Sequence, residues 1–526
     1  MRKIKILDCT FRDGGYYNNW NFDKTTVKKY IDCINNQVID CVELGFRFLN
    51  YSKYSGKFSF ISDKEIKKLK IKKKLKLSIM INASDFIKLA KQGKPDKKIV
   101  EHFLKPKHLS PIRVVRVAAH FHEINQIMSI LKKLKKYGYI VMLNLMQASN
   151  YQENVYKKTI KLIKKTKAVS VLYFADSLGC MTTNDVRRVC KYFNKYWKKE
   201  FGFHSHDNSG NALANCKQAI KNGVTWLDGT ILGMGRGAGN VSTEALLTEI
   251  NKGNINNQLK KIYDLSSNVF KKLKDRYRWG YSAYYHLASK YKIHPSYIQS
   301  ILEENKYTDE QIFEFIKKIS KVNSSSFDKR YLYEVLENSN YNKKFDNVNQ
   351  WCKNKQVLIL ANGNSIKENL NELKKFVKNN RPVVLSININ KYIGSKFIKN
   401  YVVSNKERIV LDFPFYNKLK KPLVIPINNF KELNLNLKNN KIINYGQKIT
   451  GNSIVYKQDH CKTFTNLALA YCLCYAAIGK PKKIFLAGFD GYDELHKNKM
   501  NQDVFNKFKR KNNIILKSLT KTIYKI

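Results

Sequence analysis

Two histidines separated by one residue are the strongest candidates for chemistry in this sequence. They stand in the run Phe203-His204-Ser205-His206, at the end of an apolar segment that we predict to be a strand. Because side chains alternate along a strand, His204 and His206 point to the same side. Two imidazoles on one face are good ligands for a borderline divalent metal. A pair of histidines packed for structural reasons is the alternative.

Carboxylates that could complete such a site follow two other predicted strands. After the first, the sequence reads Asp8-Cys9-Thr10-Phe11-Arg12-Asp13-Gly14-Gly15. An arginine beside an aspartate, followed by two glycines, is typical of a site loop, and a salt-bridged turn is the alternative. Glu43 lies in another apolar run, where an unpaired carboxylate would be costly. It therefore needs a cation, and Arg12 or the metal are the candidates.

Further polar groups stand near the ends of the remaining strands. The Gly-rich run Gly233–Asn240 follows the last of them, and its glycines let the backbone approach a ligand closely. Arg116 and His120 lie near the end of the fourth strand, and Asn144 and Asp176 near the ends of the fifth and sixth. We interpret these four as substrate-facing groups, and ordinary loop hydrogen bonding is the alternative.

The elements that carry these motifs alternate regularly. From Lys3 to about Asn251, short β-type runs alternate with Lys-rich amphipathic helical stretches. The eight runs are Ile4–Leu7, Ile39–Leu44, Leu77–Ile81, Arg113–Val117, Ile140–Leu145, Val169–Phe174, Phe201–His206 and Trp226–Ile231. This is the size of a closed (β/α)₈ barrel, in which chemistry lies where the strands end. An open doubly wound sheet is the alternative.

In order and strand position, the R-D-G, E-L-G, H-S-H and G-x-G-x-G-x-G-N motifs resemble those of the pyruvate carboxyltransferase-like family. These DRE-TIM metallolyases include hydroxymethylglutaryl-CoA lyase and 4-hydroxy-2-oxovalerate aldolase. The resemblance covers the N-terminal half. It implies a (β/α)₈ TIM barrel and a class II, metal-dependent aldolase or lyase that makes or breaks a carbon–carbon bond next to a 2-oxo acid. An acyltransferase-type Claisen condensation is the alternative reaction.

The resemblance also implies roles for individual residues. The positions that match the family's metal site are Asp13, His204, His206 and Asn240. They imply one divalent metal ion, Mn²⁺, Mg²⁺ or Zn²⁺. Arg12 would hydrogen-bond the enolate oxygen, and Glu43 would orient Arg12 and the water shell of the metal. The expected partners are a small 2-oxo acid and an aldehyde or sugar, and the expected assembly is a homo-oligomer.

The chain departs from the family directly after R-D-G. A glycine and Tyr16 follow, which argues against a leucine- or lysine-pathway synthase. The hydroxyoxovalerate aldolases have a histidine close behind this motif, and here none is present. The base is therefore open, with Tyr16, Tyr17 and His120 as candidates. Beyond the barrel, Tyr284 or Tyr285 is a weaker candidate to reach the site.

We predict three parts in the chain. Residues 1–255 form the barrel, residues 256–349 a helical extension with a linker, and residues 350–526 a Rossmann-like α/β domain. The linker candidates are Asn323–Phe327 and Asn338–Asn349. The predicted strands of the last domain are Val357–Leu360, Val383–Ile387, Tyr401–Val403, Leu423–Ile425 and Lys483–Ala487. They favour an open, parallel sheet.

A second candidate site lies in the α/β domain. Gly363, Asn364 and Ser365 form a turn from strand to helix, and Ser365 with Glu368 fits a capping box whose free N–H groups could bind a phosphate. Asn388 follows the next strand and suits a ligand at a topological switch point. An ordinary strand–helix turn is the alternative.

Two late segments, Ala476–Gly479 and Lys483–Gly491, resemble bacterial surface-glycan sialyltransferases. The resemblance implies a nucleotide-sugar site that includes Asp490, with His460 or His496 as a base, and a role in surface-polysaccharide biosynthesis. The alternative function is a glycosyltransferase-like enzyme in which this domain carries the main activity.

Composition limits the partners. Lys and Arg total 97 against 41 acidic residues, a formal charge of +56. The lysines are spread over predicted helix faces and no nucleic-acid motif is present, so we expect no specific nucleic-acid partner but loose contact with an anionic membrane surface. The ten unpatterned cysteines, the absence of a signal peptide and the shortness of the apolar run Leu467–Gly479 predict a cytoplasmic protein.

Overall fold

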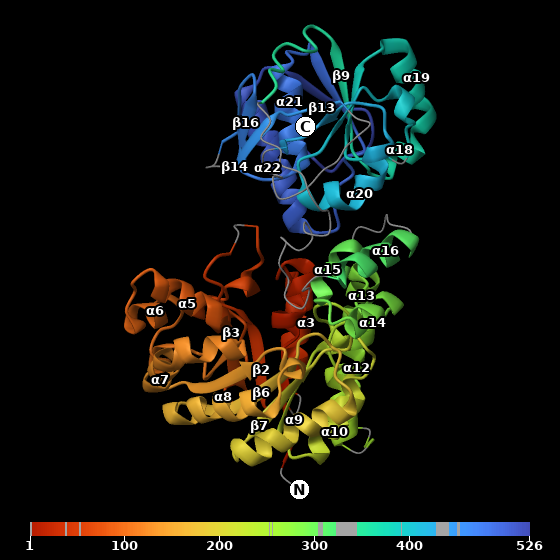
Figure 1. The fold of residues 1–526 in the computed structure, drawn as a ribbon. Helices are drawn as coiled ribbons and strands as arrows, with labels where there is room; N and C mark the ends of the chain where they lie inside the picture. The colour runs from red at the N-terminus through yellow and green to blue at the C-terminus, as the bar shows by residue number, and fades with distance from the viewer. Residues whose placement is uncertain are drawn as a thin grey trace. The chain divides into compact units, whose positions relative to one another are not determined.

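The computed structural model describes residues 3–526 except 37–38, 52–53, 252, 255, 303–308, 322–344, 391, 428–440 and 450–452. The linker candidate 323–327 lies outside the described residues, as does part of 338–349. The chain forms two compact units, Met1–Phe327 and Asp328–Ile526 (Figure 1). The division into three parts at residues 255 and 349 stays a proposal.

The first unit is a closed barrel of eight parallel strands in sequence order (Figure 1). The strands are β1 (Lys5–Asp8), β2 (Cys41–Phe46), β3 (Lys76–Asn82), β4 (Val114–Ala119), β5 (Ile140–Leu145), β6 (Val169–Asp176), β7 (Phe201–Ser205) and β8 (Trp226–Gly229). β1 pairs with β8 over four residues, from Lys5 opposite Trp226 to Asp8 opposite Gly229. This pairing closes the barrel, so the predicted TIM barrel is confirmed and the open sheet is excluded.

Helices surround the strands. They are α3 (Lys24–Ile34), α4 (Asp63–Lys68), α5 (Ala83–Lys91), α6 (Asp96–Phe103), α7 (Met128–Lys136), α8 (Glu153–Thr166), α9 (Thr183–Tyr196), α10 (Ala212–Lys221) and α11 (Thr243–Ile250). α9 shows why such segments form helices here. Thr182 caps its first turn in a capping box with Asp185, and Val186, Val189, Cys190 and Phe193 bury one stripe against the barrel.

The barrel interior is filled below the carboxyl ends of its strands. Alternate strand positions supply one buried apolar cluster, which consists of Leu7, Cys9, Cys41, Val114, Met142, Val171, Tyr173 and Trp226. The other positions pack against the helices. Because the lower interior is solid, a ligand can enter only at the end where the strands give way to loops.

A helical extension follows the barrel within the first unit. Its helices are α12 (Asn257–Leu265), α13 (Lys271–Tyr277), α14 (Ala283–Lys290), α15 (Pro295–Leu302) and α16 (Asp309–Ile319). Trp279 Nε1 donates to the carbonyl of Leu232 at 2.9 Å, and Gln299 Oε1 accepts from the N–H of Gly237 at 3.1 Å. The extension therefore holds the Gly-rich loop that follows β8.

The second unit is an α/β fold built on an open, wholly parallel sheet in the order β13-β12-β11-β10-β9-β17-β18. These strands are β9 (Gln356–Leu360), β10 (Val383–Ile387), β11 (Asn400–Val402), β12 (Leu423–Val424), β13 (Ile442–Ile443), β17 (Lys483–Ala487) and β18 (Ile515–Ser518). A small three-stranded sheet contains β14 (Gly446–Ile449), β15 (Val455–Tyr456) and β16 (His460–Thr463).

The helices of the second unit are α18 (Ser365–Glu368), α19 (Leu370–Asn380), α20 (Lys406–Lys418), α21 (Ala468–Ile478) and α22 (Leu495–Lys511). α21 is apolar on every side and buried almost throughout, so it forms part of the core rather than a surface layer. Among the described residues, none of the helices has the length and apolar character that a membrane crossing requires. All ten cysteines are free.

Candidate metal centre

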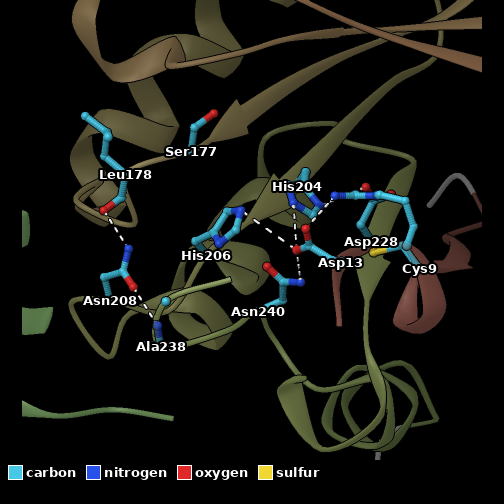
Figure 2. A network of polar contacts seen from close by, with 12 residues as sticks. Cys9, Asp13, Ser177, Leu178, His204, His206, Asn208, Asp228, Ala238 and Asn240 are labelled. Carbon is cyan, nitrogen blue, oxygen red and sulfur yellow. Dashed lines mark hydrogen bonds and ion pairs between the residues drawn. The ribbon is translucent and has the colours of Figure 1, made fainter. Parts of the chain in front are cut away.

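Three buried donors converge at the carboxyl end of the barrel (Figure 2). Asp13 ends α1 (Thr10–Asp13), directly after β1, whereas His204 lies in β7 and His206 directly follows it. Oδ2 of Asp13 lies 3.7 Å from Nε2 of His204 and 3.9 Å from Nε2 of His206. The three donor atoms are within 4.8 Å of one another. One carboxylate and two imidazoles suit a divalent metal.

The protonation states also suit a metal ion, because its ligands must be deprotonated. Burial lowers the pKa of His206 to about 3, so its imidazole is neutral and has a lone pair at physiological pH. Burial alone would raise the pKa of Asp13, but the positive charge of Arg12 holds that pKa well below its usual range. Asp13 is therefore an ionised carboxylate.

An unpartnered polar atom points to the same ligand. Oδ1 of Asn240 is buried and has no hydrogen-bond partner. Nδ2 of Asn240 donates to Oδ2 of Asp13, which leaves its oxygen free. A Cβ at Gly235 would lie 3.0 Å from Oδ2 of Asp13 and 2.5 Å from Nδ2 of Asn240, so only glycine fits there. The residues present fit a bound divalent ion.

Arg12 joins this centre to Glu43. Its Nη1 donates to Oδ1 of Asp13 at 2.6 Å, and its Nε donates to Oε2 of Glu43 at 2.7 Å. Glu43 is fully buried, and Arg12 is the nearer of the two arginines that supply the positive charge its burial demands. Nη2 of Arg12 is buried without a partner and is available to a substrate oxygen.

Asp228, in β8, is a site residue that the sequence reasoning missed. Its Oδ2 lies 2.9 Å from Nδ1 of His204 (Figure 2). The same oxygen accepts from Nη2 of Arg116 at 2.6 Å. Burial opposes ionisation of Asp228, but Arg116 lowers its pKa. Because an ionised carboxylate only accepts, Nδ1 of His204 is the donor and Nε2 keeps its lone pair toward Asp13.

Replacing Asp228 by asparagine should weaken Mn²⁺ binding by about 10- to 100-fold, because groups that orient metal ligands typically have effects of this size. Asparagine lacks the charge that balances Arg116 and can turn its NH₂ toward His204. Calorimetric titration with Mn²⁺ measures the change, and thermal unfolding of the same samples controls for folding. An affinity within about threefold of the wild type would contradict the orienting role.

Arg116 is not the substrate-facing group that we predicted. Its side chain is fully buried, and besides Asp228 it donates to Oε2 of Glu43 at 3.2 Å and to Oδ1 of Asn144 at 3.1 Å. Arg116 is therefore the buried counter-ion of two carboxylates beneath the cavity lining. Asn144, which accepts from Arg116, belongs to that lining.

A cavity opens beside the three donors. It is lined by Arg12, Asp13, Tyr16, Phe46, Met80, Asn82, Ala118, Asn144, Met146, Ala175, Ser177, His204, His206 and Arg236. Of the three candidate bases, Tyr16 therefore borders the substrate space. Burial raises the pKa of its phenol, which keeps the hydroxyl protonated at neutral pH.

The other predicted residues lie outside this lining. Asp176 alternates with Ala175 and Ser177, and its carboxylate accepts the N–H groups of Cys180 and Met181 at 3.0 Å. Burial raises its pKa to about 7. For Asp176 the loop-hydrogen-bond alternative holds, because its partners come from its own loop. The N–H of His120 likewise donates to Glu123, at the start of a 3₁₀ turn.

The tyrosine candidates beyond Tyr16 meet the Gly-rich loop. The hydroxyl of Tyr17 donates to the carbonyl of Gly237 at 2.5 Å and lies 3.2 Å from the hydroxyl of Tyr285. Tyr284 instead donates to Asp309 at 2.6 Å. Tyr17 and Tyr285 therefore support the loop rather than line the cavity.

In the second unit the predicted capping box is wrong. Asn364, not Ser365, precedes the first turn of α18, and no side chain caps it. The N–H of Ser365 donates to Oδ2 of Asp490 at 2.7 Å, and its hydroxyl donates to Oδ1 of the same residue. A Cβ at Gly363 would lie 2.5 Å from Oδ1 of Asp490. The N–H predicted to bind phosphate is already bonded to a carboxylate, which would repel an anion.

The remaining predicted residues of that unit have varied surroundings. Oδ1 of Asn364 accepts from the hydroxyl of Tyr392 at 3.2 Å, whereas Oδ1 of Asn388 is buried without a partner. His460 pairs with Asp459 at 2.7 Å, and Nδ1 of His496 is buried without a partner. Nucleotide-sugar binding by this unit stays a prediction.

Comparison with known proteins identifies the family of the first unit. The HMGL-like family model matches residues 3–269. A 4-hydroxy-2-oxovalerate aldolase of Carboxydothermus hydrogenoformans is 29% identical over 264 residues, which cover 48% of this chain and 71% of the relative. An oxaloacetate decarboxylase of Mycobacterium tuberculosis is 24% identical over 251 residues, which cover 48% of this chain and 71% of that relative.

A solved structure agrees. The N-terminal domain of a Bacteroides vulgatus protein, provisionally named an aldolase, is 31% identical and superposes with a TM-score of 0.51, covering 59% of this chain and 99% of that domain. The predicted family, the carbon–carbon lyase class and the dependence on a divalent metal are confirmed. Because the matched residues make up just over half of the 526, the chain belongs to the HMGL-like family.

Proposed function

We propose that the first unit is a divalent-metal-dependent aldolase or lyase that makes or breaks the carbon–carbon bond next to a 2-oxo acid through a pyruvate-type enolate. The convergence of Asp13, His204 and His206 on one point at the barrel mouth carries the proposal. Cleavage of 4-hydroxy-2-oxovalerate and decarboxylation of oxaloacetate, the reactions that two relatives are named for, both leave the enolate of pyruvate.

Asp13, His204 and His206 would hold the ion, with Asn240 beside them. When bound, the metal supplies a Lewis acid that polarises the 2-oxo group. Nη2 of Arg12 donates a hydrogen bond to the oxygen that gains charge, and Glu43 fixes the guanidinium for that task. Because this donor is buried, its interaction with developing charge is stronger than it would be in water.

Proton transfer completes the condensation. The C3 proton of the 2-oxo acid passes to solvent water, and the electron pair that it leaves forms the new bond between C3 and the carbonyl carbon of the acceptor. The acceptor oxygen then takes a proton. Tyr16 lines the cavity and keeps its phenolic proton, so we assign it as the donor in this direction. The phenolate then takes a proton from solvent water, which restores the neutral phenol, and cleavage runs the same transfers in reverse.

The test is hydrogen exchange into pyruvate. Full-length protein is incubated with pyruvate and Mn²⁺ in D₂O, and the methyl signal is followed by NMR. We expect exchange that depends on the metal and stops when EDTA is added. Absence of exchange with pyruvate, 2-oxobutyrate and oxaloacetate alike would overturn the proposal.

Several finer predictions stay predictions. They are the role in surface-polysaccharide synthesis, the glycosyltransferase alternative, the nucleotide-sugar, membrane and homo-oligomer partners, and the cytoplasmic location. The proposed lyase chemistry depends on none of them, because all of its residues lie within residues 3–269.

A further inference from the structure

Arg236 is the second arginine that lines the cavity, and unlike Arg12 and Arg116 it forms no ion pair with any described carboxylate. Arg12 and Arg116 each pair with two carboxylates. Within the part of the chain that the structure describes, Arg236 has no carboxylate oxygen within 4.0 Å, and its buried Nε has no hydrogen-bond partner. Its guanidinium lies over the ring of Tyr16, 5.2 Å from the centroid.

The loop that carries Arg236 is held on both sides. Gly235 packs directly on Asp13 and Asn240. On the other side, the N–H of Gly237 donates to Gln299 and its carbonyl accepts from Tyr17. Gly235 and Gly237 are therefore both held in place. Arg236, which lies between them, lines the cavity.

The charges of the site indicate what Arg236 is for. Asp13, Glu43 and Asp228 form their ion pairs with Arg12 and Arg116, and these five groups together carry one excess negative charge. A divalent ion and the carboxylate of one 2-oxo acid together add one positive charge and bring the site to neutrality. Arg236, which forms no ion pair with a described carboxylate, then adds one further positive charge.

We propose that Arg236 binds an anionic group, carboxylate or phosphate, on the second substrate. The inference rests on the proposed function and makes it specific: the carbonyl compound that joins or leaves the enolate is an acid or a phosphate ester, not a neutral aldehyde. A planar guanidinium suits both groups because it donates two parallel hydrogen bonds. The ring of Tyr16 supports the guanidinium without accepting a hydrogen bond from its N–H groups. Phe46, Met80 and Met146 offer apolar walls for the intervening carbons.

Matched pairs of acceptors test the proposal. Full-length protein with pyruvate and Mn²⁺ is given succinic semialdehyde or butanal, and glycolaldehyde phosphate or glycolaldehyde, and condensation is followed by NMR. We expect kcat/KM to favour the charged member of at least one pair by about 10- to 100-fold, the range for a hydrogen-bonded charge. The first pair reports on a carboxylate and the second on a phosphate.

Variants of Arg236 test whether this residue causes the preference for a charged acceptor over a neutral one. Arg236→Gln should reduce it to less than about threefold, Arg236→Lys should keep part of it, and Arg187→Gln, an exposed arginine on α9, should match the wild type. Equal kcat/KM within both pairs for the wild type, or no condensation with either charged aldehyde, would overturn the inference. The wild-type comparison decides even if a variant fails to fold.

Pyruvate exchange without any aldehyde separates this inference from the proposed function. No exchange by the wild type refutes the proposed function itself. If Arg236→Gln slows exchange as much as it slows condensation with the charged aldehyde, Arg236 acts on the 2-oxo acid and the inference is wrong. A loss in condensation that exceeds the loss in exchange by tenfold or more supports it.

Discussion

Replacing His204 by alanine should reduce metal-dependent exchange of the pyruvate methyl protons by more than about 100-fold, because even groups that only support a metal ligand contribute 10- to 100-fold. The substitution removes one of three converging donors and also leaves Asp228 without the imidazole that it orients. We expect Mn²⁺ affinity to fall with activity. Exchange in D₂O and calorimetric titration with Mn²⁺ measure the two quantities on the same preparation.

His108→Ala is the matched control, because His108 is exposed and its ring has no part in the centre. It should bind Mn²⁺ and exchange protons like the wild type. If His204→Ala retained exchange within tenfold of the wild type at saturating Mn²⁺, the three donors would not be the metal site. Thermal unfolding of both variants distinguishes loss of the ligand from loss of the fold.

The strands of the barrel could be predicted because they are buried on both faces. Such strands read as continuous apolar runs, and the runs at 77–81 and 140–145 correspond to β3 and β5. The prediction for the second unit missed the three short strands of the small sheet, and in the parallel sheet it missed β13 and β18. β13 has only two residues, and β18 is a sheet-edge strand whose sequence Ile-Leu-Lys-Ser is partly exposed throughout, so neither leaves a run to detect.

The energetic cost of burying a charge marked one carboxylate as needing a positive partner, and it could have marked a second. Glu43 stood out as a carboxylate in an apolar run, and it does pair with Arg12. Asp228 stands in a similar run, 226–231, and the same reasoning would have marked it. Asp176 shows why the rule is not sufficient. It also follows an apolar run, yet backbone N–H groups of its own loop satisfy it.

Contacts between distant segments account for the remaining errors. Ser365 and Asp490 are separated by 125 residues, and no local pattern shows that one occupies the N–H group of the other. The direction of Arg116 depends on barrel closure, which brings Asp228 of β8 to β4 across the interior. Residue type, spacing and the family resemblance together predicted the three converging donors, whereas the charge balance around them required the closed barrel.

Replacing Arg12 by lysine should slow pyruvate exchange by about 100- to 1000-fold, the usual effect of removing one donor to a developing oxyanion. Lysine keeps a positive charge near Asp13 and Glu43. It lacks the guanidinium, which donates to both carboxylates and has Nη2 left over for the cavity. Mn²⁺ affinity should change by less than about tenfold, because the three donors remain. Exchange rate and Mn²⁺ titration together give the measurement.

Replacing Arg12 by alanine separates the role of Arg12 in orienting groups at the site from its role in the stability of the fold. Arg12→Ala leaves Glu43, which is fully buried, without its nearest counter-ion, so we expect a loss of about 3–5 kcal/mol in the free energy of unfolding. Arg12→Lys should lose much less, and Arg276→Lys, an exposed position on α13, should lose nothing. If Arg12→Lys lost metal affinity and exchange in parallel, the arginine would act by holding Asp13 in place. A selective loss of exchange assigns Nη2 to the reacting oxygen.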